Sequence, residues 1–340
     1  MSRPAWARWV TRISLAIGLV ALGFTIYSIG PRNIARYFER IGWWWFAVIA
    51  LEVAITTLDA VAIRAFLSPE SGLVKLRSAL LSQLAGRAVN AVTPSGNLGE
   101  AVKVSVLTEY VSQSRAVATI LLYNVISFAV ELWMVAIAAL VLVIFVPMDG
   151  AWTGVMIATC VICSLLAIGM LALARRGLLG SLLGAIRRIR LVSQARYERW
   201  LAKLAPVDDK MKLVEGARKR DRTLGIGAVV TSRMTSMTLS YLVFHAVGGH
   251  ITLSFVAATT VGGFVIYILS TLVPMGVGIS EGGYWGMFRA IGENPARGVT
   301  MVIARRVTLV VYATIGLVLM TASETVRRAR DARAAASSPP

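Results

Sequence analysis

Residues Gly86 to Val104 read GRAVNAVTPSGNLGEAVKV, and this stretch sets the organisation that we expect for the whole, very apolar chain. Its centre cannot continue as a helix, because Pro94 has no backbone N–H donor and disfavours a helical residue before it. Gly96 and Gly99 permit backbone conformations that other residues avoid. In lipid, non-helical backbone persists only where protein or a water-filled cavity surrounds it. The stretch therefore predicts a broken element enclosed within the protein.

A second copy of the pattern lies near the end of the chain. Residues Pro274 to Glu281 read PMGVGISE, with Pro, two Gly and Glu in the same order. A polar residue follows each copy at a similar distance: Asn124 lies 30 residues after Pro94, and Arg306 lies 32 residues after Pro274. Two ordinary loops at the membrane surface are the simpler interpretation. The duplication favours a functional pair, because interrupted hydrophobic segments at matching places in two halves indicate a transporter binding site.

The composition is that of a membrane protein with many spans. Of the 340 residues, 57% are hydrophobic and 15% are charged, whereas soluble globular domains carry about 25% charged residues. The net charge of +18 comes from cations beside apolar spans, so we expect anionic or zwitterionic membrane lipids as partners and no nucleic acid. Cys160 and Cys163 lie in an apolar span without further ligands, and we expect no metal and no cofactor.

The fold class that we predict is all-α and polytopic, with about six spanning helices. The apolar runs lie near residues 13–29, 43–67, 115–146, 151–174, 223–247 and 299–321. With a cytoplasmic N-terminus, the basic block and the basic tail both reach the cytoplasm only if each broken element enters and leaves on one side. The chain then contains two re-entrant hairpins, one from each side of the membrane, arranged as an inverted repeat.

The predicted domain is a single transmembrane unit over residues 1–322. Its first repeat covers about 43–146 and its second about 223–322, and 323–340 form a disordered basic tail. We expect the cytoplasmic membrane, with both termini in the cytoplasm. Residues 175–222 hold fourteen Lys or Arg and five acids, and apolar residues recur among them at roughly helical spacing, which predicts a basic amphipathic cytoplasmic helix. Whether it only anchors the topology or recruits anionic headgroups stays open.

Charged side chains within the spans mark the candidate site. Each costs about 2.5–3.5 kcal/mol at mid-helix, so such residues are usually paired or functional. One hypothesis pairs Glu52 or Asp59 with an arginine of the second half, either to hold the halves together or to serve a substrate. Hydroxyl residues crowd the span 223–247 and suit close helix packing or a polar path. The acids are Glu52, Asp59, Glu100, Glu131 and Glu281, and the bases are Lys103, Arg233, Arg305 and Arg306.

The motifs resemble those of a known family. NAVTPSGNLGEAVK, and later LVPMGVGISEG with ARRVT, are similar to the transmembrane region of lysylphosphatidylglycerol synthases, a flippase-like family, over about Val10 to Thr321. The resemblance implies a lipid translocase. This chain has Tyr123-Asn124 where the family often has Asp-Arg, and Lys103 where Arg is common. The residues that match the two family motifs are Pro94, Gly99, Glu100, Lys103, Pro274, Gly276, Gly278, Glu281 and Arg306.

The function that we expect is a lipid flippase or transporter, because carboxylate and guanidinium groups at mid-depth suit a polar headgroup. The alternative is a membrane enzyme, with Glu100 and Glu281 as acid and base, or an accessory subunit acting on a polyprenyl- or phospholipid-linked substrate. We see no soluble aminoacyltransferase domain and expect no aminoacylation. A homo-oligomer or a lipid-biosynthesis enzyme is a compatible partner. The predicted substrate-binding residues are Arg87, Asn90, Pro94, Gly96, Gly99, Glu100, Lys103, Asn124, Arg233, Pro274, Gly276, Gly278, Glu281, Arg305 and Arg306, and the predicted ion-pair residues are Glu52, Asp59 and Glu131.

Overall fold

The computed structural model describes residues 41–92, 98–188, 194–212, 218–246, 248–270 and 278–308, with a few isolated positions outside these ranges. The predicted first span near 13–29 and the predicted tail 323–340 lie outside the described residues. All regular secondary structure in the described part is helical. The elements are α3 (Trp44–Phe66), the short η1 (Glu70–Leu73), α4 (Leu76–Val92), α5 (Leu98–Leu107), α6 (Gln113–Phe145), α7 (Gly150–Arg176), α8 (Leu178–Arg188), α9 (Gln194–Lys212), α10 (Lys219–Ala246), α11 (Leu253–Ser270), α12 (Ile279–Ala290) and a final helix over 295–308.

Four helices in the described part, α3, α6, α7 and α11, are long and apolar enough to span a membrane. The all-α, multi-pass prediction is therefore confirmed. In α7, 11% of the most apolar stretch is buried inside the protein, so the other described helices cover little of it. The helix α10, predicted as a span, has 28 residues but is less apolar because it carries Arg233 and many hydroxyls. The helix α11 reaches spanning length, although it was predicted as one arm of a re-entrant hairpin.

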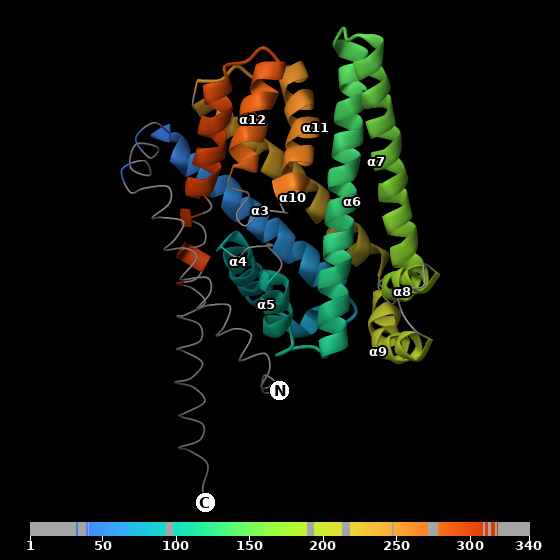
Figure 1. Ribbon diagram of the computed structural model, residues 1–340. Helices are drawn as coiled ribbons and strands as arrows, with labels where there is room; N and C mark the ends of the chain where they lie inside the picture. The colour runs from blue at the N-terminus through green and yellow to red at the C-terminus, as the bar shows by residue number, and fades with distance from the viewer. Residues whose placement is uncertain are drawn as a thin grey trace, which may run out of the picture.

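Helices α3 and α10 pack against one another in antiparallel fashion and cross the middle of the molecule (Figure 1). Near one end of the pair, a Cβ added to Gly225 would lie 2.5 Å from the Phe66 ring, so only glycine allows this close approach. At the other end, the Trp44 ring lies edge-on to His245 with centroids 5.6 Å apart. The helices α3 and α10, with which the two predicted repeats begin, thus run in opposite directions; the inverted repeat itself stays a prediction.

Helices α4 and α5 form a tight antiparallel hairpin around two glycines. A Cβ on Gly99 would overlap the carbonyl oxygen of Gly86 and the amide of Asn90, so the two backbones touch. The hydroxyl of Ser82 donates to the carbonyl of Lys103 at 3.1 Å and continues the contact along the pair. Small residues permit this close packing, which is common between helices in membranes.

Helices α11 and α12 form the second antiparallel hairpin, in which glycines of each helix pack against side chains of the other. A Cβ on Gly283 would lie 2.7 Å from Ile266, and one on Gly263 would lie 3.1 Å from the Tyr284 hydroxyl. The second arms of the hairpins are short: α5 has 10 residues and α12 has 12. At 1.5 Å per residue these arms extend about 15 and 18 Å, against a hydrocarbon core of about 30 Å.

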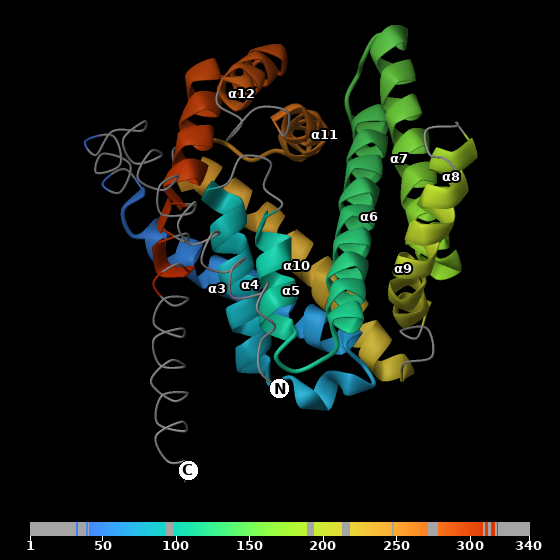
Figure 2. The same ribbon diagram turned by 60° about the horizontal axis from the view of Figure 1, so that its bottom comes forward.

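The two hairpins lie at opposite ends of the long α6–α7 pair. Figure 1 shows α4 and α5 beside the end where α6 begins, and α11 and α12 beside the end where α6 stops. Figure 2 shows the same separation after rotation of the molecule. The α6–α7 turn uses Asp149, whose carboxylate accepts the Trp152 N–H at 3.1 Å and caps α7. The arrangement is consistent with hairpins that approach from the two sides.

The prediction of one amphipathic helix across the basic block was wrong. The block forms two helices, α8 and α9, and residues 189–193 between them lie outside the described part. The carboxylate of Asp208 in α9 accepts the backbone N–H groups of Leu179 and Gly180 at 2.9 and 2.7 Å. The first N–H groups of a helix have no partner within the helix. Asp208 satisfies two of them and therefore folds α9 back onto α8.

Candidate functional site

Two polar cavities lie inside the helix bundle, one beside each hairpin. The cavity beside α4 and α5, the first cavity, has a volume of about 520 Å³. The cavity beside α11 and α12, the second cavity, has a volume of about 600 Å³. Both volumes fall within the range of about 300–1,000 Å³ that small-molecule sites occupy. The two cavities share the lining residues Glu131, Arg233, Ser236 and Tyr267.

Arg233 on α10 is the charged centre of this shared layer. Its guanidinium lies 3.0 Å from the Asp59 carboxylate on α3 and 3.3 Å from the Glu131 carboxylate on α6. It also donates to the Tyr123 hydroxyl at 2.9 Å. One arginine thus joins three helices, including both members of the α3–α10 pair. The structure brings together Asp59, Glu131 and Arg233, all of which were candidates from the sequence.

Asp59 is the most deeply buried acid of this network, with 2% of the residue exposed. One carboxylate oxygen accepts from the Ser232 hydroxyl at 2.6 Å, and the other accepts from the Gln83 amide at 3.0 Å. A buried charge is tolerated only when it is paired and its remaining lone pairs are hydrogen-bonded. The Asp59 site meets both conditions, with ligands from α4 and α10.

Glu100 at the start of α5 organises the first hairpin. One carboxylate oxygen accepts from Lys103 and from Asn90, each at 2.9 Å, and the other accepts from Asn124 of α6 at 2.9 Å. The side-chain amide oxygen of Asn90 accepts the Gly99 N–H at 2.6 Å, which joins α4 to the first turn of α5. The motif glutamate therefore joins α4, α5 and α6, and it lines the first cavity.

Glu52 does not pair with an arginine of the second half, in contrast to one option of the sequence hypothesis. Its carboxylate lies 2.9 Å from Arg87 of α4, within the first repeat. The Arg87 guanidinium also donates to the Thr56 hydroxyl at 2.8 Å. Glu52 and Arg87 thus link α3 to the neighbouring α4. The acid of α3 that pairs with an arginine of the second half is Asp59, which contacts Arg233.

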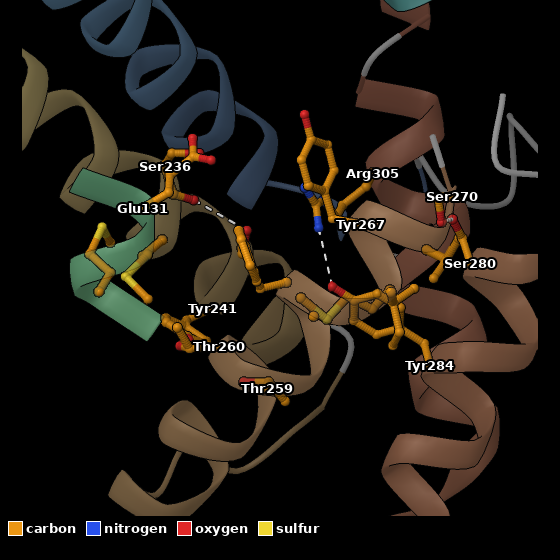
Figure 3. A pocket seen from close by; sticks show the side chains of 18 of the residues that line it. Glu131, Ser236, Tyr241, Thr259, Thr260, Tyr267, Ser270, Ser280, Tyr284 and Arg305 are labelled. Carbon is orange, nitrogen blue, oxygen red and sulfur yellow. Dashed lines mark hydrogen bonds between the residues drawn. The ribbon is translucent and has the colours of Figure 1, made fainter. Parts of the chain in front are cut away.

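Glu281 at the start of α12 organises the second hairpin. Its carboxylate accepts from the Gly278 N–H at 2.8 Å and from the Arg306 guanidinium of helix 295–308. Gly278 has φ +84°, a conformation that favours glycine, so this position turns the chain into α12. Arg305, next to Arg306, donates to the Tyr284 hydroxyl at 3.3 Å (Figure 3). Both arginines line the second cavity.

Some predicted residues cannot be placed. Pro94, Gly96, Pro274 and Gly276 lie outside the described residues. The described sites also include residues that were not predicted as binding residues: Gln83, Tyr123, Tyr267 and Tyr284. Gln83 had a usable signal, because it lies four and seven residues before Arg87 and Asn90 on one helical face. In the described part of the chain, no three His, Cys, Asp or Glu side chains cluster closely enough to hold a metal ion.

The comparisons with known proteins identify one family. The model of the family described as Lysylphosphatidylglycerol synthase TM region matches residues 12–316. This range contains both motifs, both hairpins and every residue named above for the two cavities. Neither the curated proteins nor the solved structures gave a match.

Proposed function

Because the chain belongs to the Lysylphosphatidylglycerol synthase TM region family, we propose that it moves a polar-headed lipid between the two leaflets of the membrane. The observation that carries this proposal is the pair of polar cavities, one beside each hairpin, that meet at Arg233. A headgroup can enter one cavity and leave from the other while its acyl chains stay among the surrounding lipids. The apolar outer face of α7 offers such a lipid contact.

Arg233 is the residue that a headgroup must pass. Its guanidinium bridges Asp59 and Glu131, so a headgroup oxygen competes with one carboxylate at a time for the same donors. Its Nε–H is buried and has no hydrogen-bond partner among the described residues, which leaves a donor for a ligand or a water molecule. We therefore assign to Arg233 the role of a partition between the cavities that opens when a headgroup replaces one carboxylate.

The side of the membrane that each cavity faces follows from the basic helices. The cations of α8 and α9 favour the cytoplasmic side under the positive-inside rule. These helices lie toward the same end of the molecule as α4 and α5 in Figure 1. Buried Arg115, at the beginning of α6, donates to the Lys210 carbonyl of α9 at 2.8 Å and fixes α9 at this end. We therefore assign the first cavity to the cytoplasmic leaflet of the cytoplasmic membrane.

The test is lipid exchange between leaflets in vesicles that contain the purified full-length chain. We expect the wild-type protein to move a fluorescent phospholipid without changing it chemically, and Arg233→Gln to abolish the exchange. The matched control is Arg297→Gln, because Arg297 forms only a surface pair with Glu293 at 3.4 Å. Equal exchange in vesicles with and without the wild-type protein would refute the proposal.

The enzymatic alternative has less support from the geometry. It needs Glu100 and Glu281 to act together on one substrate, as paired carboxylates do in acid–base chemistry. Glu100 lines the first cavity, whereas Glu281 bonds to Arg306, which lines the second. Both carboxylates already accept hydrogen bonds on each oxygen. Mass spectrometry of the vesicle lipids distinguishes the two functions, because an enzyme produces a new lipid species.

A further inference from the structure

The two cavities differ in the way their charges are balanced. In the first cavity every lining base has a carboxylate within 3.0 Å: Arg87 with Glu52, Lys103 with Glu100, and Arg233 with Asp59. In the second cavity Arg233 contacts Glu131, and Arg306 contacts Glu281. Arg305 also lines this cavity, and none of the described carboxylates lies within ion-pair distance of it. Because Arg233 is shared between Asp59 and Glu131, the two cavities do not differ in a simple charge count; the second differs in lining a guanidinium, that of Arg305, which no described carboxylate contacts.

Arg305 has donors to spare. Its side chain is exposed, and among the described residues its guanidinium makes one hydrogen bond, to the Tyr284 hydroxyl at 3.3 Å. An arginine carries five N–H donors and stays charged at any physiological pH. At the depth of a membrane helix, an uncompensated cation is costly and usually serves a binding function. Arg305 thus presents unused N–H donors to a cavity, an arrangement that suits an anion.

The hydroxyls around Arg305 are arranged as donors. The Tyr284 oxygen accepts from Arg305, so its own proton is available to a further acceptor. Tyr284 is 8% exposed and its hydroxyl abuts Gly263 of α11, which holds the ring in place. Ser270 and Ser280 share one hydrogen bond at 2.9 Å, which leaves one of the two protons for a ligand. All these groups line the second cavity (Figure 3).

We propose that Arg305 and Tyr284 bind a phosphate oxyanion in the second cavity. The fork of a guanidinium matches two phosphate oxygens, and the tyrosine hydroxyl supplies a further donor. The phosphate is that of a lipid headgroup, which rests on the proposed function, or a free phosphate ion. In the first case the chain selects phosphate-bearing lipids over glycolipids on the α11–α12 side. We expect no such selection in the first cavity, because each of its lining bases already contacts a carboxylate.

The experiment measures bound lipid directly, so it does not depend on transport. The purified full-length protein is offered equal amounts of phosphatidylglycerol and a diglycosyl diacylglycerol in detergent, and native mass spectrometry counts the retained lipids. We expect the wild type to retain phosphatidylglycerol preferentially, and Arg305→Gln to reduce that preference about tenfold because the charge and the fork are lost. Arg305→Lys keeps the charge without the fork, so we expect an intermediate preference.

The matched control is Arg289→Gln. Arg289 lies at the end of α12, over the Trp285 ring at 5.4 Å, and does not line the second cavity. This substitution removes the same charge, and we expect an unchanged lipid preference. An Arg305→Gln protein with the wild-type preference overturns the proposal. Tyr284→Phe, which removes only the hydroxyl, decides the question if Arg305→Gln fails to fold: about a threefold loss supports the site, and no loss overturns it.

Inorganic phosphate separates the two sources of the oxyanion. If the headgroup is the ligand, we expect phosphatidylglycerol to stay bound in phosphate buffer, because its acyl chains also contact the protein. Displacement of the lipid by inorganic phosphate would assign the site to the free ion and overturn the lipid selection. A protein that retains phosphatidylglycerol but exchanges no lipid between vesicle leaflets would refute the proposed function and leave the phosphate site in place.

Discussion

The two motif glutamates occupy equivalent places and are neutralised in different ways. The carboxylate of Glu100 pairs with the ammonium group of Lys103, three residues later on the same helix. It also accepts a hydrogen bond from the neutral side-chain amide of Asn124 on the next long helix. Glu281 has Tyr284 at the corresponding position, and its positive charge comes from Arg306 of the next long helix. The distant ligands lie 24 and 25 residues after their glutamates. Each motif glutamate is therefore contacted from the next long helix, but the cation comes from the same helix in one case and from that long helix in the other.

The difference determines which hairpin can move at lower cost. The α4–α5 hairpin carries its own ion pair, so a shift against α6 breaks a hydrogen bond from the neutral amide of Asn124 to the Glu100 carboxylate. The α11–α12 hairpin is joined to helix 295–308 by the Glu281–Arg306 ion pair, and a shift there separates opposite charges. Hydrogen bonds to charged groups contribute about 1.5–3 kcal/mol, and the loss of a charge partner costs more. We infer that the first hairpin is held less strongly to its next long helix than the second, although the Arg87–Glu52 ion pair also joins the first hairpin to α3.

The largest effect is expected at Arg233, which both halves share. Arg233→Gln leaves the Asp59 carboxylate, 3% exposed, without a cation. Removal of one member of a buried pair costs about 3–5 kcal/mol, so we expect a large drop in the free energy of unfolding. The double variant Asp59→Asn/Arg233→Gln should recover most of it. Thermal unfolding in detergent measures both, and a double variant no more stable than the single one would contradict the pairing.

Moving the cationic side chain of the first site from α5 to α6 would make this site resemble the second. Lys103→Met keeps most of the buried volume but removes the local cation of Glu100, and we expect a loss of about 3 kcal/mol. Asn124→Arg in the same chain supplies a cation from α6, as Arg306 does for Glu281. We expect it to restore at least half of the lost stability. If the double variant is less stable than Lys103→Met alone, then Glu100 and Asn124 do not correspond to Glu281 and Arg306.

The glycine contacts of the two hairpins also differ, and we expect smaller effects of their substitution on stability. Gly99→Ala places a methyl group against backbone of α4, which cannot rotate away, and we expect a destabilisation at the upper end of about 1–3 kcal/mol. Gly283→Ala meets the Ile266 side chain, which can change rotamer, so its cost should be smaller. Gly282 faces open space, and Gly282→Ala should stabilise α12 by up to about 1 kcal/mol. Equal melting temperatures for Gly99→Ala and Gly282→Ala would show that α4 and α5 do not touch.

The smallest effects are expected at the distant ligands themselves. Arg306→Gln removes the cation of Glu281, and we expect a loss of about 2 kcal/mol. Asn124→Ala removes one of three hydrogen bonds to Glu100, whose cation remains, and should cost about 1 kcal/mol. Chemical unfolding of the two variants in one detergent measures the difference. A costlier Asn124→Ala would show that the first hairpin is the one held more strongly to its next long helix.

Part of the candidate site could be predicted because local rules govern it. The glutamates of the two motifs stand out as charges in apolar sequence, and the similar spacing singled out Asn124 and Arg306, although the contacts of these residues with Glu100 and Glu281 were not predicted. The lining tyrosines could not be recognised in the same way. Tyr123 and Tyr284 face polar groups of other helices, and tyrosine in an apolar run equally suits a packed core or a membrane interface.

The sequence by itself determined the helical class, the membrane location and the two interrupted segments, since apolar length, Pro and Gly act through the nearest residues. Only the tertiary structure decided that Asp59 rather than Glu52 meets Arg233, that one polar space consists of two adjoining cavities, and that Arg305 lacks a carboxylate in the described part of the second. The reason is physical. Each of these facts depends on which helix faces come together, and those contacts join residues far apart in the chain.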